Sequence, residues 1–415
     1  MKKGYLSQYF KGVALKHLSE VEADVTRSNQ HEFNGVEGLR GILGEPDGKV
    51  RFAAKFLYLS DQDDEPIIED GFLTWYDARQ KARQERGVMR WEYRLYFPTN
   101  LVSQNAASGD LLVIARQSDD TLLAIVAEKD TTVERQIMWL FGFSDLTHPG
   151  FSVKAELETD QDRIGFAARV VLEQIGVEME EDAPNYLDQM LAKFGGSFPK
   201  TIEFSAYARS TVPDLSGRDD PDAALVAWME REEILFRTLE KHLLGEKLRG
   251  LTQAGVRDTE PFIKLVQSAL QRRKSRAGSA LENHLEQVFT DHGVTYTRTG
   301  VTERNLKPDF IFPGIIHYHD AVFPDKRLTM LASKSTCKDR WRQILNEAAR
   351  IPHKHLLTLE PSISENQTNE MKAERVQLVL PHSLHSTYTP AQQGWLMSVA
   401  AFTEQARQRQ NGVGH

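Results

Sequence analysis

The sequence has a single cysteine, Cys337, among its 415 residues. One thiol cannot form a disulfide within the chain, and it excludes a zinc site built from several cysteines. No apolar run approaches the roughly 20 residues that cross a bilayer. The N-terminal segment MKKGYLSQYF also lacks the apolar stretch of a secretory signal. We therefore expect a cytoplasmic protein with no membrane partner.

The chain also lacks an overall positive charge, since 51 Lys and Arg face 59 Asp and Glu and the formal net charge is −8. That sum argues weakly against nucleic-acid binding. Binding needs only a local basic face, however. Three basic segments are candidates for phosphate contact, and they lie at 78–94, 271–276 and 338–342.

The length is sufficient for two domains, and the chain changes character along its course. The N-terminal part shows short runs rich in β-branched and aromatic residues, separated by turn-forming residues, which is typical of a small barrel or sandwich. We predict a mostly-β domain at 1–175, a linker or hinge region at 176–220, and an α/β domain at 221–415. The expected N-terminal strands are 50–60, 91–98, 110–117 and 121–129, the last two as a hairpin.

The C-terminal part alternates helical and strand-like patterns, which predicts an α/β fold. Residues 221–271 show apolar positions at helical spacing. Strand-like runs follow near KPDFIFP and at 328–334, 355–360 and 376–381, with a predicted helix at 337–351.

Polar residues stand at the ends of these core elements. Asp309 interrupts an apolar run, Lys334 ends the next run, and Glu347 lies in the helix expected after it. Hydrolysis of a phosphodiester needs a divalent cation held by carboxylates, with a lysine beside it. Glu282, in an earlier helix, is placed to approach as well. By spacing alone, a strand-terminating Asp, a surface Lys and a solvated Glu explain the pattern equally well.

A wider stretch of sequence favours the first interpretation. The segments KPDFIFPG, LTMLASKSTCKDRWRQILNEA and LLTLEP, in this order, closely resemble the catalytic domain of the EcoRII restriction endonuclease family, over roughly 195–400. That family belongs to the PD-(D/E)XK nucleases, in the variant whose second acidic residue has moved from the strand to the following helix.

The resemblance implies a role for each matching residue. Asp309 and Glu347 would bind Mg²⁺, Lys334 would be the catalytic lysine, and Glu282 would be an accessory carboxylate. Tyr318 matches a family tyrosine near the site, although a half-buried aromatic residue is an equally good interpretation.

Base recognition is predicted for the triplet Lys338, Asp339 and Arg340. Arg or Lys binds guanine and Asp binds cytosine in the major groove, and in the family the matching residues read the G·C pairs of a CC(W)GG-type site. A charged helix N-terminus is the alternative. A palindromic site implies a homodimer through the catalytic domain. Further contacts to DNA are predicted, against the alternative of a solvated helix end, for Arg272, Arg273, Lys274 and Arg276.

The segments NQHEFNGVEGLRGILG (29–44), WYDARQKARQERGVMRW (75–91), GDLLVIA (109–115) and VERQIMWLFG (133–142) resemble, in their order, the EcoRII effector domain. This resemblance implies a DNA-binding pseudobarrel similar to plant B3 domains. A basic loop on a β scaffold enters a DNA groove in such domains. Base contacts are predicted for Arg79 and Glu85, although a solvated charged loop has the same composition. Phosphate contacts are predicted for Lys81, Arg83, Arg86 and Arg90.

The resemblance implies a prokaryotic type II restriction endonuclease, of type IIE, which cleaves double-stranded DNA near the nucleoid with Mg²⁺ and has a cognate DNA methyltransferase. Two alternatives stay open. One is a modification-dependent endonuclease whose N-terminal domain senses a modified base. The other is a DNA-binding regulator with an inactive nuclease fold.

Overall fold

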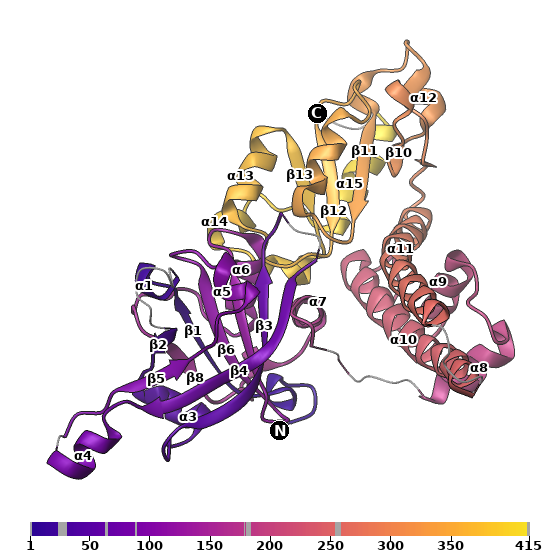
Figure 1. The fold of residues 1–415 in the computed structure, drawn as a ribbon. Coiled ribbons are helices and arrows are strands. Elements are labelled where there is room, and N and C mark those ends of the chain that lie inside the picture. Colours follow the sequence, from indigo (N-terminus) through magenta and orange to yellow (C-terminus); the bar gives the residue numbers. More distant parts are fainter. Residues whose placement is uncertain are drawn as a thin grey trace. The chain divides into compact units, whose positions relative to one another are not determined.

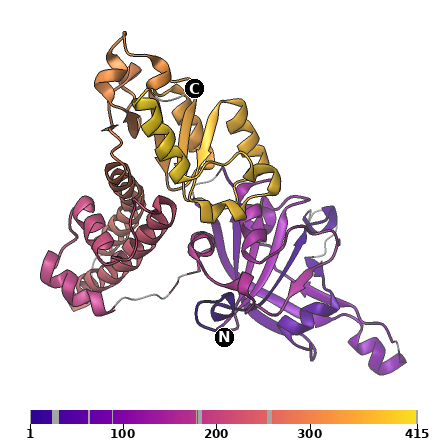
Figure 2. The same ribbon diagram turned by 180° about the vertical axis from the view of Figure 1, so that it is seen from behind.

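A computed structural model describes residues 2–23, 31–62, 65–87, 89–177, 179, 184–253 and 259–412, with the side chains at 184, 185, 252, 253 and 338–340 excepted. The chain divides into two compact units (Figures 1 and 2). The first comprises Met1–Glu178 with Ser362–Gln367, and the second comprises Met179–Pro361 with Thr368–His415.

An eight-stranded sheet forms the centre of the described part of the first unit, in the order β2-β5-β4-β3-β7-β6-β1-β8. Strands β3 and β7 are parallel, and the other neighbours are antiparallel. The strands are β1 (Phe10–His17), β2 (Glu32–Asn34), β3 (Val50–Leu59), β4 (Ile67–Asp77), β5 (Tyr93–Tyr96), β6 (Leu111–Gln117), β7 (Leu122–Ala127) and β8 (Ser152–Lys154).

Alternation of side chains explains how β3 packs. Phe52, Ala54 and Phe56 are buried on one face, whereas Arg51 and Lys55 are exposed on the other. The four predicted strands correspond to β3, β5, β6 and β7, and β6 and β7 form the predicted hairpin. The sequence did not reveal β4, in which Glu69, Asp70 and Gly71 interrupt the apolar residues near its start.

The sheet of the first unit remains open in the part of the chain that the structure describes, because its short edge strands β2 and β8 are at opposite ends of the strand order. A mostly-β N-terminal unit is therefore observed, in the form of an open sheet. Its helices are α1 (Glu20–Ala23), α3 (Arg40–Leu43), α4 (Gln80–Arg86), α5 (Leu101–Asn105), α6 (Thr132–Leu140) and α7 (Phe166–Gln174), with 3₁₀ helices Leu6–Gln8, Glu37–Leu39 and Asp160–Asp162.

Helices begin the second unit, within the region that we expected to be a linker. Residues 176–220 contain α8 (Pro184–Phe194) and α9 (Thr201–Ser210), which pack against α10 (Pro221–Gln253). The apolar side chains of these helices form one buried cluster, which explains why the segment is folded. The long helix α11 (Glu260–Asp291) packs beside α9 and α10. Buried members of the cluster are Met190, Phe204, Tyr207, Ala208, Leu235, Phe236, Leu239 and Leu243.

A mixed five-stranded sheet follows, in the order β13-β12-β11-β10-β9. Strands β11, β12 and β13 are parallel, and β10 is antiparallel to both of its neighbours. The strands are β9 (Thr297–Arg298), β10 (Phe310–Phe312), β11 (Thr329–Lys334), β12 (Lys354–Thr358) and β13 (Val376–Val379). The helices are α12 (Ile315–His319), α13 (Glu365–Ala373), α14 (Pro390–Gln393) and α15 (Val399–Gln410), with 3₁₀ helices Glu303–Asn305, Asp325–Arg327 and His382–Thr387.

Aromatic side chains fix α11 and α15 on this sheet. The ring of Phe289, on α11, contacts Phe310 and Phe312 at centroid distances of 5.3 and 5.1 Å. The ring of Phe402, on α15, lies 5.7 Å from that of Phe312. These contacts hold α11 beside β10, the strand that follows Asp309.

The helix predicted at 337–351 is wrong in type and length. The segment is a 3₁₀ helix, Lys338–Asn346, and Glu347 follows its end with an extended backbone. Trp341 and Ile344 are buried at a spacing of three, which matches the three residues per turn of a 3₁₀ helix. Among the described residues, no helix is long and apolar enough to cross a membrane.

Candidate active site

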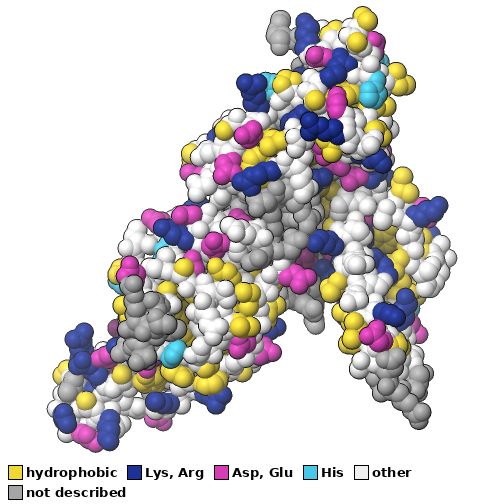
Figure 3. Space-filling model, turned by 45° about the horizontal axis from the view of Figure 1, so that its top comes forward, with side chains coloured by type: hydrophobic (Ala, Val, Ile, Leu, Met, Phe, Trp, Pro, Cys, Tyr) yellow, Lys and Arg dark blue, Asp and Glu magenta, His cyan; other side chains and the backbone are white. Residues whose placement is uncertain are grey.

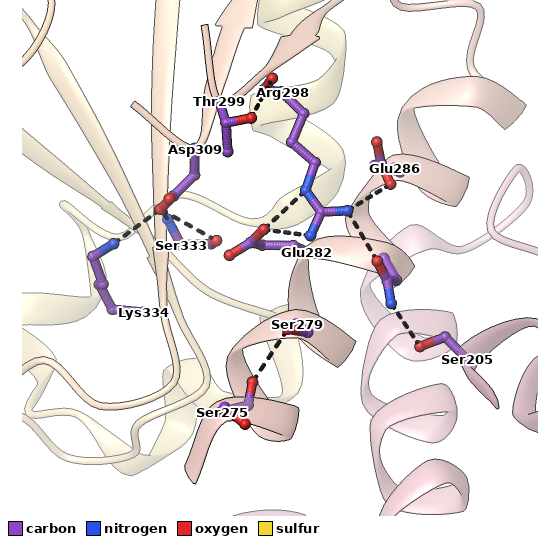
Figure 4. A network of polar contacts seen from close by, with 11 residues as sticks. Ser205, Ser275, Ser279, Glu282, Glu286, Arg298, Thr299, Asp309, Ser333 and Lys334 are labelled. Atoms are coloured by element: carbon purple, nitrogen blue, oxygen red, sulfur yellow. Dashed lines mark hydrogen bonds and ion pairs between the residues drawn. The ribbon is translucent and has the colours of Figure 1, made fainter. Parts of the chain in front are cut away.

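Asp309 and Lys334 are brought together by the antiparallel pairing of β10 and β11. Phe310 pairs with Leu331, so Asp309 lies beside the end of β11. Its Oδ2 atom accepts hydrogen bonds from Lys334 Nζ at 3.0 Å and from the backbone N of Ser333 at 2.8 Å (Figure 4). The two side chains are 16% and 27% exposed. The predicted pair is therefore in contact, partly open to solvent.

Glu347 belongs to the same electrostatic environment. Burial raises the pKa of its carboxyl, and the negative charge of Asp309 raises it further, against the opposing effect of Lys334 and Lys354. No hydrogen bond or ion pair of this carboxylate occurs within the described residues. The structure thus places Glu347 within electrostatic reach of Asp309, at the end of a 3₁₀ helix and not inside an α-helix.

Glu282 approaches from α11. Burial raises the pKa of its carboxyl; Arg298 opposes this increase, whereas Asp309 adds to it. Figure 4 shows the Glu282 carboxylate between Arg298 and the Asp309–Lys334 pair. Asp309, Lys334 and Glu282 therefore lie together at one edge of the mixed sheet (Figure 4), and the charges of Asp309 and Lys334 also act on Glu347.

Sequence reasoning missed Arg298, on β9. Its Nε donates to Glu282 Oε2 at 2.9 Å. Its Nη1 donates to Asn283 Oδ1 and to Glu286 Oε2, both at 2.9 Å. One arginine thereby fixes three side chains of α11 beside the site (Figure 4). No spacing or composition signal marks this residue, because its role depends on the packing of β9 against α11.

The donor set fits a divalent cation of the Mg²⁺ type. Burial and the charge of Asp309 raise the pKa of the Glu347 carboxyl, so a cation bound between the two side chains would stabilise the ionised form of Glu347. Mg²⁺ commonly takes one or two protein carboxylates and fills its other positions with water and substrate phosphate. No group of three or more His, Cys, Asp or Glu side chains placed to hold a metal ion is found among the described residues. Asp309 and Glu347 are the candidate ligands that the family resemblance implies.

Tyr318 lies close to the segment that follows Glu347, since its hydroxyl accepts a hydrogen bond from the backbone N of Arg350 at 3.3 Å. Its side chain is 1% exposed, and its hydroxyl donates to the carboxylate of Glu303, with Oη 2.6 and 2.7 Å from the two oxygens. Burial, followed by the contact with Glu303, raises the pKa of Tyr318 to about 12. These contacts agree with the alternative interpretation of Tyr318 as a buried aromatic residue, and its catalytic role stays a prediction.

The basic segment of α11 is only partly available for DNA. Arg276 is 6% exposed and forms ion pairs with Glu232 and Glu233, so its predicted contact with DNA is contradicted by burial. Arg273 pairs with Glu240 at 2.7 Å. Arg272 stacks on the ring of Phe198 at 4.4 Å and is half-buried, whereas Lys274 is exposed.

The predicted base-reading triplet, Lys338, Asp339 and Arg340, lies outside the residues whose side chains the structure describes. It begins the 3₁₀ helix after β11. Its role stays a prediction.

The basic segment of the first unit forms an extension that carries α4, and Lys and Arg side chains gather there (Figures 1 and 3). Arg79 pairs with Glu92 at 2.5 Å. Arg83 pairs with the buried Asp77 and stacks on the ring of Trp91 at 3.4 Å. These two arginines stabilise the extension itself. The exposed predicted residues are Lys81, Glu85, Arg86 and Arg90.

A carboxylate pair with an adjacent lysine, at the edge of a mixed sheet, is a donor set suited to metal-assisted phosphodiester chemistry. Residues 236–403, which include all four site residues, match the family model described as EcoRII C terminal. The chain is 44% identical over 207 residues to the type II restriction enzyme EcoRII of Escherichia coli. This match spans 49% of the chain and only 50% of that protein. The predicted resemblance of the C-terminal half to the EcoRII family is confirmed.

Solved structures of two restriction enzymes are also similar. Metal-depleted Ecl18kI in complex with uncleaved, modified DNA has 18% identity and a TM-score of 0.45, over 57% of this chain and 87% of that chain. A PspGI–substrate DNA complex has 15% identity and a TM-score of 0.43, over 52% of this chain and 94% of that chain.

Proposed function

We propose that the chain is a Mg²⁺-dependent type II restriction endonuclease that hydrolyses DNA at a short, G·C-rich palindrome of the CC(W)GG type. The main support for the proposal is the contact of 3.0 Å between Lys334 Nζ and Asp309 Oδ2. This contact puts a positive and a negative side chain together at a partly exposed edge of the mixed sheet. The matched relative, described as a type II restriction enzyme, also supports the proposal.

Each site residue has a defined task in this proposal. Asp309 and Glu347 would hold the metal ion, which would supply polarisation of the scissile phosphate and a lower pKa for a bound water. Lys334 neutralises negative charge that develops on the phosphate. Glu282, restrained by Arg298, adds negative charge at the side of the site that faces α11.

Recognition of DNA is assigned to both units. Lys338, Asp339 and Arg340 read G·C pairs, and Lys274 and Arg272 contact the backbone. A palindrome read by one catalytic domain requires a homodimer, in which each subunit cuts one strand. A cognate methyltransferase protects the host sites.

The first unit is proposed to be a B3-like effector domain that binds a further copy of the site, as in a type IIE enzyme. Exposed Lys81, Arg86 and Arg90 support this proposal, since cations on a protruding segment reach phosphates. A cavity between its sheet and α5 has a volume of about 20 Å³. That is room for one water and too little for an extruded base, which weighs against a reader of modified bases at this cavity.

Digestion of a mixed set of plasmids with Mg²⁺, followed by sequencing of the ends, tests the proposal. Cuts at one short palindrome are expected from the wild-type chain and not from Asp309→Asn or Lys334→Met, while Lys326→Met, an exposed lysine, should cleave normally. Cleavage by both site variants would contradict the site. Parallel digests of methylated plasmids separate the modification-dependent alternative, and absence of metal-dependent cutting on every plasmid would favour the inactive regulator.

A further inference from the structure

Lys354, the first residue of β12, is a buried lysine that the proposed mechanism does not use. It is 5% exposed. Its ammonium group donates hydrogen bonds to three backbone carbonyls, those of Glu347, of Ala348 at 2.8 Å and of Ile351 at 2.7 Å. A lysine ammonium has three N–H donors, so this contact uses all of them on one short segment.

The segment Glu347–Ile351, here named the Glu347 turn, has one backbone hydrogen bond of its own, from Ile351 N to the carbonyl of Ala348 at 2.9 Å, and Glu347 N donates to the carbonyl of Ile344 at 3.0 Å. Glu347 is extended, at φ −79° and ψ 144°, and Ala348 has a positive φ of 47°. Ala348 and Ile351 are 0% and 2% exposed. Carbonyls turned inward at such a place need a partner, and leaving a buried acceptor without one is costly.

Contacts on other atoms complete the restraint of the turn. The backbone N of Ala349 donates to Glu303 Oε2, and that of Arg350 donates to Tyr318 Oη, both at 3.3 Å. The guanidinium of Arg350 donates to carbonyls of residues 318, 320 and 323. Lys354 therefore binds the carbonyl side of the turn, whereas Glu303 and Tyr318 bind its amide side.

The position of the Glu347 carboxylate depends on this backbone. In the described residues the carboxylate has no hydrogen bond or ion pair that would orient it independently. A small displacement of the turn therefore moves the carboxylate relative to Asp309, which sits on a separate strand.

We propose that Lys354 is the positioning residue that places Glu347 opposite Asp309 by holding the three carbonyls of the Glu347 turn. The inference rests on the proposed function for what the two carboxylates bind. It does not make Lys354 a catalytic residue, since its donors are all used on the backbone.

The test uses the full-length chain with Lys354→Met and, as a matched control, His355→Leu. His355 is the next residue of β12, on the opposite face of the strand. It is 2% exposed and contacts the carbonyl of Met330 at 3.2 Å. Both substitutions remove one buried polar side chain from the same strand, but only Lys354→Met removes a contact with the Glu347 turn. Lys354→Arg keeps the charge, although its planar donors cannot meet three converging carbonyls, and it serves if Lys354→Met fails to fold.

Two readouts decide the inference. Hydrogen exchange of the amides at 349–351 should become roughly 10-fold faster in the Lys354 variants and should not change in His355→Leu. Binding of Mn²⁺, followed by the signal of the free ion in electron paramagnetic resonance, should weaken about 10- to 100-fold. In a Glu347→Gln background the Lys354 substitution should cause no further loss, because it acts through Glu347.

Unchanged exchange in the Lys354 variants would overturn the inference, and so would faster exchange with wild-type Mn²⁺ affinity. If His355→Leu weakened Mn²⁺ binding as much as Lys354→Met, the loss would be a general destabilisation of the protein. That result would also overturn the inference. If the wild-type chain binds no Mn²⁺, the proposed function fails, and the exchange rates alone decide whether Lys354 holds the turn.

Discussion

Arg298 and Glu282 join β9 to α11 at the edge of the site, with Arg298 Nε 2.9 Å from Glu282 Oε2. The charge of each side chain offsets the effect that burial has on the pKa of the other. Contact with Glu282, and then Glu286, raises the pKa of Arg298 although burial opposes this, and Arg298 limits the upward shift of the Glu282 pKa. An arginine that is absent from the proposed chemistry thus controls the charge of a carboxylate beside it.

Replacement of Arg298 by methionine should therefore affect both folding and cleavage. Its side chain is 26% exposed and that of Glu282 is 21% exposed, so the loss of these charge-assisted hydrogen bonds should cost about 2 kcal/mol of unfolding free energy. The rate of cleavage should fall about 10-fold, as is typical when a residue that orients a site is removed. Urea unfolding and plasmid cleavage measure the two effects.

Arg407→Met is the control for this prediction. Arg407 and Glu404 form an exposed pair on α15, with side chains 49% and 44% exposed. Exposed pairs contribute little to stability, so neither measurement should change. Equal effects of the two substitutions would contradict the role of Arg298.

A second prediction concerns Arg276, which we had expected to contact DNA. Its side chain is 7% exposed, and that of its partner Glu232 is 0% exposed. Removal of one partner from a buried pair costs about 3–5 kcal/mol, so Arg276→Met should strongly lower the unfolding free energy. DNA affinity of the remaining folded protein should keep its salt dependence, because no phosphate contact is lost.

Arg249→Met, on an exposed pair of the same helical region with side chains 66% and 57% exposed, should leave stability unchanged. A variant of Arg276 that folds normally and binds DNA with a weaker salt dependence would show that the arginine reaches DNA after all.

The contrast between the strand ends at the site and the basic segment of α11 shows which features can be predicted from the sequence. Apolar runs located β10 and β11, and hence the edge where Asp309 and Lys334 meet, because strand ends are encoded locally. The burial of Arg276 depends on glutamates 43 and 44 residues away on α10. A basic run looks the same in sequence whether its partners are carboxylates of the chain or phosphates.

The position of Glu347 was predicted only in part. Its membership of the site followed from the family resemblance, and in the structure the charge of Asp309 raises the pKa of its carboxyl. Its backbone did not follow, since the choice between an α-helix and a 3₁₀ helix depends on burying Trp341 and Ile344 against the sheet. The restraint by Lys354 is likewise invisible in sequence, because all three of its acceptors are backbone atoms.

A third prediction separates structural from DNA-binding cations in the extension of the first unit. Alanine substitutions of exposed Lys81, Arg86 and Arg90 should each lower the slope of log affinity against log salt by about 0.9 if each neutralises one phosphate. Fluorescence anisotropy of a labelled duplex at several salt concentrations measures the slope. Arg83→Ala is the matched control, because Arg83 is occupied by Asp77 and Trp91.

For Arg83→Ala we expect the extension to lose structure. The slope of log affinity against log salt should fall by less than the roughly 0.9 expected for a lost phosphate contact. An unchanged slope in the triple variant of Lys81, Arg86 and Arg90 would show that the extension does not bind DNA.

The last prediction concerns acid stability and His355. Burial, and then the charge of Arg409, lowers the pKa of His355 to about 3 in the folded chain, from a usual value of 6.5. Below pH 6.5 the unfolded chain takes up a proton that the folded chain does not bind. The stabilisation is therefore complete above pH 6.5 and is lost as the pH falls toward 3, at up to about 1.4 kcal/mol per pH unit.

His355→Leu should flatten the dependence of the unfolding free energy on pH between 6 and 4 by about 1 kcal/mol per unit. The substitution also removes the hydrogen bond to Met330, which adds an offset that does not vary with pH. Denaturant unfolding at several pH values separates the slope from the offset. Parallel curves for wild type and His355→Leu would mean that His355 is protonated in the folded chain.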